Sequence, residues 1–183
     1  LRQQFPLLPV DLMRIPIFSM SIGTSICSFT GQMLAMLSLP FFLQETLKRS
    51  DVTTGLLLTP WPIATMIIAP LAGRLVERIH AGILGSIGMT IFAIGLFLLA
   101  VLPSNPTNMD IIWRLFICGS GFGLFQTPNN STIISSAPSN RSGGASGMLG
   151  TARLLGQTLG ATQVAMIFYL VPINSSQTCL YSA

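Results

Sequence analysis

The sequence contains very few charged residues. Of 183 residues, nine are Lys or Arg, five are Asp or Glu and one is His, so 8% are charged, whereas 50% are hydrophobic. A soluble domain of this size usually has about 25% charged residues, so this chain cannot cover itself with a solvated surface. The nine basic residues are scattered and form no patch that would suit a nucleic acid. These scarcities exclude a soluble enzyme, a disordered tail and a nucleic-acid-binding module, and they indicate an integral membrane protein.

Cysteine and histidine are also scarce. Cys27 and Cys118 lie within apolar runs and Cys179 lies near the C-terminus, so their spacing supports neither a metal site nor a disulfide framework. His80 is the only histidine. We therefore expect no metal and no cofactor. The chain begins at Leu1 without a signal-peptide pattern, and we expect it to be a segment of a longer protein.

Long uncharged intervals predict five transmembrane helices. A helix needs roughly 20 residues to cross about 30 Å of hydrocarbon, and five intervals are long enough for one crossing each. We place the spans near residues 20–42, 52–72, 82–102, 112–134 and 147–170, followed by a polar tail at 171–183. The predicted fold is all-α, with residues 1–183 forming one partial membrane domain.

The basic residues predict the orientation of these spans. Lys and Arg accumulate on the cytoplasmic side of membrane proteins, and a cytoplasmic N-terminus places six of them inside and three outside. The inner residues are Arg2, Arg14, Arg74, Arg78, Arg141 and Arg153, and the outer ones are Lys48, Arg49 and Arg114. This orientation leaves the polar tail outside.

Uncharged polar residues and prolines lie inside the predicted spans. No Asp or Glu does, so an acid for proton coupling is expected elsewhere in the longer protein. Pro60 and Pro62 interrupt the second span, and residues 126–130 (Gln-Thr-Pro-Asn-Asn) interrupt the fourth. Such breaks form binding sites in transporters, although a proline kink packed by neighbouring helices is the alternative. The candidate cavity residues are amides and aromatics: Gln32, Phe41, Trp61, Gln126, Asn129 and Asn130.

Small residues and one arginine also stand out. Glycines four residues apart predict close helix packing, and such pairs are Gly119 and Gly123, Gly143 and Gly147, and Gly156 and Gly160. Arg153 lies about one turn inside the fifth predicted span, where a cation is costly. We expect it either to extend to the inner headgroups or to form a conformation-dependent hydrogen bond or ion pair.

The loop at residues 72–82 resembles a motif of the major facilitator superfamily. Gly73, Leu75, Glu77, Arg78 and Gly82 match the pattern G-x-L-(a)-D-R-x-G, with Glu in place of Asp and without the usual downstream basic residues. The resemblance implies a gate on the cytoplasmic face, with charges that pair with a helix end in the outward-open state.

Further segments resemble the C-terminal domain of the fourteen-helix drug/proton antiporters in that superfamily, most of all the SmvA-type methyl-viologen and quaternary-ammonium pumps. They are residues 39–44, 55–60, 121–128 and 142–156. The resemblance implies helices nine to thirteen, an incomplete six-helix bundle in a bacterial inner membrane. It implies lipophilic cationic drugs, protons and the missing N-terminal half of the transporter as partners.

The sequence also suggests three alternatives. Residues 144–147 (Gly-Ala-Ser-Gly) also occur in rhomboid proteases, but Ser146 would need a histidine base at membrane depth, and His80 belongs to a loop. We therefore expect no enzyme. Transport of a sugar or metabolite stays open because the same fold serves many substrates. An inactive remnant of a broken transporter gene also stays open, and we expect this segment alone to transport nothing.

Overall fold

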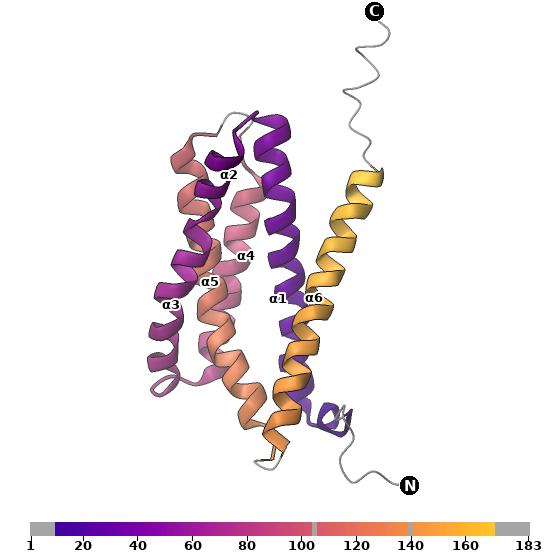
Figure 1. Ribbon diagram of the computed structural model, residues 1–183. Coiled ribbons are helices and arrows are strands. Elements are labelled where there is room, and N and C mark those ends of the chain that lie inside the picture. Colours follow the sequence, from indigo (N-terminus) through magenta and orange to yellow (C-terminus); the bar gives the residue numbers. More distant parts are fainter. Residues whose placement is uncertain (1–9, 104–105, 139–140, 171–183) are drawn as a thin grey trace, which may run out of the picture.

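A computed structural model describes residues 10–103, 106–138 and 141–170 (Figure 1), and every regular element among them is a helix, as predicted. The predicted polar tail lies outside these residues. The elements are the short 3-10 helix η1 (Val10–Arg14), α1 (Pro16–Phe41), the π-helical turn η2 (Phe42–Thr46), α2 (Asp51–Leu58), α3 (Pro60–Val76), α4 (Ala81–Ala100), α5 (Asn108–Ser135) and α6 (Ser142–Leu170).

The five predicted spans fall on α1, on α2 with α3, and on α4, α5 and α6. Several helices begin earlier than the predicted spans, most clearly α6, which starts at Ser142. The reason is that uncharged intervals mark the apolar part of a helix, whereas small and polar residues can extend it. Three stretches of the described chain are both long and apolar enough to cross a membrane: Pro16–Glu45, Asp51–Val76 and Ala81–Ala100. Helices α5 and α6 are long enough, with 28 and 29 residues, but more polar.

Neighbouring helices alternate in direction (Figure 1). Helix η1 and the connections α3–α4 and α5–α6 lie at the lower end in that view, whereas η2 and the α4–α5 connection lie at the upper end. Arg14, Arg74, Arg78 and Arg141 belong to the segments at the lower end, which we call the basic end. The upper end carries both signs of charge: Glu45, Lys48, Arg49, Asp51 and Asp110.

Helix α5 packs against both α3 and α4, and α6 packs mainly against α1. Four aromatic side chains, one each from α1, α3, α4 and α5, meet in the interior and form what we call the aromatic cluster: Phe29, Trp61, Phe92 and Phe122. Their ring centroids lie 5.5–6.4 Å apart, mostly in edge-to-face or tilted arrangements. This geometry is favourable for aromatic pairs, so the cluster fixes how these four helices meet.

Candidate functional site

A buried polar cluster joins α5 to α1. Asn129 follows Pro128, which lies inside α5 and lacks the backbone N–H of an ordinary helical residue. The Asn129 amide donates to Ser25 Oγ at 2.7 Å and to the Ser21 carbonyl at 3.3 Å, and its Oδ1 accepts from Thr24 Oγ1 at 3.4 Å. Ser25 is 1% exposed and Asn129 is 9% exposed. These hydrogen bonds give the buried polar groups of Asn129 and Ser25 partners, without which their burial would be costly.

A cavity of about 700 Å³ opens beside this cluster, between the lower halves of α1 and α4 and the C-terminal part of α5. Asn129, Thr24 and Ser21 contribute polar groups, and His80 lies at the end of α4 that borders it. Its wall contains hydroxyl and amide groups alternating with apolar side chains: Ile17, Met20, Ser86, Met89, Thr90, Phe125, Thr132 and Ser136. The uncharged polar groups of this cavity can form hydrogen bonds with a ligand between the helices.

We predict that Asn129→Ala destabilises the full-length protein by about 1–2 kcal/mol. The truncation leaves the hydroxyl of Ser25 buried without its partner. Asn130→Ala is the matched control, because the Asn130 side chain is only partly buried and makes no hydrogen bond with the described residues. The measurement is thermal unfolding in detergent, and equal stability of the two variants would contradict the role of the cluster.

The remaining predicted amides are placed differently. Gln32, Gln126 and Asn130 are half-buried, and within the described chain they form no hydrogen bond. Their amides are therefore available to a ligand or to another segment, whereas the Asn129 amide nitrogen already donates two hydrogen bonds to α1. The sequence alone does not distinguish Asn129 from Asn130. In the structure, Asn129 joins α5 to α1, whereas the Asn130 amide makes no hydrogen bond with the described residues.

The two aromatic residues predicted to line the cavity differ in exposure. Trp61 belongs to the aromatic cluster and is 2% exposed, so it contributes packing rather than an accessible wall. Phe41, near the upper end of α1, is 49% exposed and meets Phe168 of α6, with ring centroids 5.2 Å apart. An accessible aromatic face therefore exists at Phe41 and not at Trp61.

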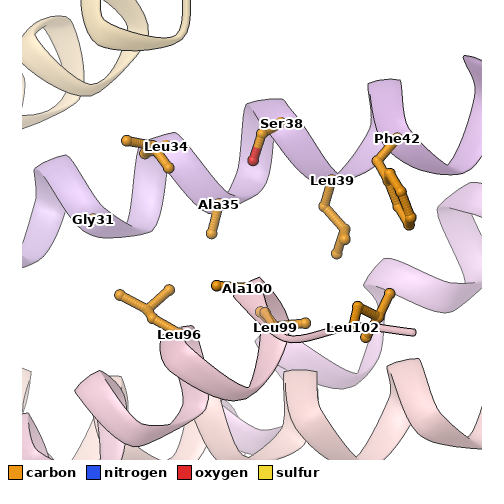
Figure 2. Close-up of a pocket in the computed structure, with 10 residues that line it drawn as sticks. All are labelled: Gly31, Leu34, Ala35, Ser38, Leu39, Phe42, Leu96, Leu99, Ala100 and Leu102. Carbon is orange, nitrogen blue, oxygen red and sulfur yellow. The ribbon is translucent and has the colours of Figure 1, made fainter. Parts of the chain in front are cut away.

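A second, apolar cavity of about 500 Å³ lies between the upper halves of α1 and α4. Figure 2 shows Leu34 and Leu39 of α1 opposite Leu96 and Leu99 of α4, with Phe42 of η2 at one end. Ser38 supplies the only side-chain hydroxyl among the lining residues. This cavity can accept an apolar group but has few means of orienting a polar ligand.

The predicted gate loop connects α3 to α4 at the basic end. Glu77 and Arg78 are exposed, and neither forms an ion pair with another described residue. His80 caps α4, because its Nδ1 accepts a hydrogen bond from the Gly82 N–H at 3.4 Å. Gly73 lies four residues before Glu77 in α3, and a Cβ atom at Gly73 would lie 3.9 Å from Thr127 Cγ2 on α5. The loop charges are thus free to engage a segment outside the described chain.

Helix α6 meets α1 through Gly156 and Gly160. A Cβ atom at Gly156 would lie 2.6 Å from the Ile26 carbonyl oxygen, and one at Gly160 would lie 2.6 Å from that of Thr30. Gly143 and Gly147, for which the spacing predicts similar packing, have no described atom within 4 Å of such a position. The prediction is wrong for that pair within the described chain, because glycine spacing identifies a smooth face but not the presence of a neighbour.

Arg153 lies on the exposed side of the α1–α6 contact. Its guanidinium carbon is 5.4 Å from the centroid of the Phe29 ring, which is a cation–π distance. It forms no hydrogen bond or ion pair with other residues in the described part of the chain.

Sequence reasoning missed two features of this region. The first is the pairing of Ser21 and Ser25 with Asn129, which their one-turn spacing on α1 could have suggested. The second is Arg114, whose guanidinium donates to the Leu98 carbonyl at 2.8 Å and to the Val101 carbonyl at 3.4 Å. Arg114 therefore caps the C-terminal end of α4, where a positive charge is favourable.

The chain is similar to known membrane transporters. It is 64% identical to the uncharacterized transporter YebQ of Escherichia coli strain K12, over 97% of this chain and 39% of that protein. It is 31% identical to the multidrug resistance protein Stp of Mycobacterium tuberculosis, over 87% of this chain and 29% of Stp. It is 29% identical to the multidrug efflux pump LfrA of Mycolicibacterium smegmatis, over 91% of this chain and 33% of LfrA.

These alignments cover most of this chain, but the chain spans at most 39% of the length of these relatives. The family model described as Major Facilitator Superfamily matches residues 2–161. Because this match covers residues 2–161, the chain belongs to the major facilitator superfamily, and its long apolar helices are those of a multi-pass membrane protein.

Proposed function

We propose that the full-length protein exports lipophilic organic cations in exchange for protons, as the SmvA-type pumps do. The observation that carries this proposal is the similarity to Stp and LfrA, whose names describe multidrug resistance and multidrug efflux. The similarity extends over 87% and 91% of this chain.

The chemistry of the helices is compatible with such substrates. The half-buried amides of Gln32, Gln126 and Asn130 can form hydrogen bonds without selecting one ligand, and Phe41 offers an aromatic face to a flat cation. Helices α5 and α6 are more polar than the stretches Pro16–Glu45, Asp51–Val76 and Ala81–Ala100. Polar faces of membrane helices usually meet a water-filled cavity or a protein neighbour, so we assign α5 and α6 to the translocation path.

The proposed location is a bacterial inner membrane, with the basic end in the cytoplasm. Arg14, Arg74, Arg78 and Arg141 belong to segments at that end, as the positive-inside rule requires. There the loop containing Glu77 and Arg78 would act as a gate against the other half of the transporter. Because the acids of the described chain lie at helix ends, the proton-coupling acid is assigned to that other half.

The test is efflux of ethidium and methyl viologen from cells that express the full-length protein, with and without a proton uncoupler. We expect active efflux that is lost on uncoupling, and no efflux from cells that express residues 1–183 alone. Efflux that survives uncoupling would contradict proton exchange. The absence of efflux from a well-expressed full-length protein would contradict export of cations and direct attention to sugars or metabolites.

A further inference from the structure

Arg153 lies much deeper along its helix than the sequence indicates. Helix α6 begins at Ser142, so Arg153 follows eleven residues later, which corresponds to about 16 Å at roughly 1.5 Å per residue. Its partner Phe29 lies thirteen residues after the start of α1, near the middle of the stretch Pro16–Glu45. Two adjacent helices therefore place this guanidinium near the middle of a hydrocarbon layer about 30 Å thick.

This depth weighs against a role as a headgroup anchor. Arginine side chains near helix ends can extend to the membrane surface, but Arg153 is three turns above the start of α6. Its guanidinium instead stacks on Phe29, which is 3% exposed and also contacts Phe122 of the aromatic cluster. The cation is thus held at mid-depth by a rigid part of the bundle.

Neither α6 nor the helices that it packs against carry an Asp or Glu near the level of Arg153. Helix α6 packs against α1 and α5. The titratable groups on α1 and α5 are Cys27 on α1 and Asp110, Arg114 and Cys118 on α5. Asp110 lies at the upper end of α5, whereas α5 joins α6 at the lower end (Figure 1). The other acids also lie away from mid-helix positions: Asp11 belongs to the short helix η1, and Glu45, Asp51 and Glu77 lie at helix ends.

Arg153 shares one side of α6 with two polar side chains and one glycine. Ser146, Gly150 and Gln157 lie seven and three residues before it and four residues after it, so they share its side of the helix. Ser146 and Gly150 are exposed and Gln157 is half-buried. This side of the helix, with one cation at its centre, does not suit lipid, and it does not suit a free organic cation either, because like charges repel.

We propose that Arg153 binds a membrane-embedded carboxylate, and that this carboxylate is an Asp or Glu side chain in the other half of the full-length transporter. The proposal rests on the proposed function only in that the chain works as part of a longer transporter. An ionisable side chain inside a membrane is normally paired, and a protein carboxylate removes the repulsion that Arg153 would exert on a cationic substrate. The resulting ion pair joins the two halves and is broken when the carboxylate is protonated.

The test is thermal unfolding of the purified full-length protein in detergent as a function of pH, which requires no transport activity. The wild type should lose stability as the pH falls through the titration of the carboxylate, because protonation leaves Arg153 unpaired. Arg153→Gln should lose most of this pH dependence, and Arg153→Lys should retain it. Arg14→Gln, a charge removal at the exposed basic end, is the matched control and should behave as the wild type.

A scan of the membrane-embedded acids in the other half completes the test, and it keeps the proposal testable if Arg153→Gln does not fold. One Asp→Asn or Glu→Gln variant should show the same loss of pH dependence. Unchanged pH dependence in Arg153→Gln, or the absence of any such acid, would overturn the proposal.

A selective loss of binding of carboxylate-bearing substrates by Arg153→Gln, with the pH dependence intact, would also overturn it and assign the charge to the substrate. Failure of the dye-efflux assay alone would contradict the proposed function and leave this ion pair standing.

Discussion

Replacing Gly156 with leucine is expected to separate α6 from α1 and to abolish transport by the full-length protein. The space at this position is closed on the α1 side, because a Cβ atom would lie 2.6 Å from the Ile26 carbonyl oxygen and 2.7 Å from Phe29 Cβ. One of these neighbours is backbone, which cannot move aside as a flexible side chain could. Overpacking of this kind costs about 1–3 kcal/mol or more. Helix α6 has few other contacts with the described bundle, so the damage should concentrate at this interface.

The measurement combines thermal unfolding in detergent with dye efflux at matched expression. Gly147→Leu is the control in the same helix, since no described atom lies within 4 Å of a Cβ there and leucine favours a helix more than glycine does. The control should unfold at or slightly above the wild-type temperature. If both variants lost stability equally, the close contact between Gly156 and α1 would not be the cause.

Trp61→Ala is expected to be among the most destabilising substitutions in this chain, at about 3–5 kcal/mol. The side chain is 2% exposed and contacts Phe92 and Phe122 at ring-centroid distances of 5.8 and 6.4 Å. Its removal leaves a cavity where three helices meet. Its Nε1 has no hydrogen-bond partner among the described residues, so Trp61→Phe should retain most of the stability.

Trp113→Ala serves as the control because it removes the other tryptophan, which is 40% exposed. It should cost much less than Trp61→Ala when unfolding is followed by calorimetry, which does not depend on tryptophan fluorescence. A Trp61→Ala protein that kept its stability but lost affinity for ethidium would show that Trp61 lines the cavity, as the sequence-based prediction has it.

The fold class could be predicted because the bilayer imposes it. The uncharged intervals have the length that a helix needs to cross the bilayer, and a helix satisfies all its backbone groups within one span. The loop at residues 72–82 and the segments around Gln126 and Gly156 indicated the family. The family model that matches residues 2–161 confirms it. None of these inferences requires knowledge of which side of a helix meets which neighbour.

The helix faces could not be predicted in this way. In a membrane, lipid-facing and packed surfaces are both apolar, so hydropathy does not separate them. Hence Trp61 and Phe41 appear equivalent in the sequence, although one is buried in the aromatic cluster and the other is exposed.

By itself, the sequence determined that this protein is an all-helical membrane protein of a transporter family, because charge spacing and loop motifs are properties of the chain alone. The tertiary structure decided that the Asn129 side chain is hydrogen-bonded to α1, that the Asn130 side chain makes no hydrogen bond with the described residues, and that Arg153 contacts Phe29 near the middle of α1. Those properties depend on how far each helix extends and on which helix lies beside it. Contacts between segments that are distant in the sequence determine the length and the neighbours of each helix.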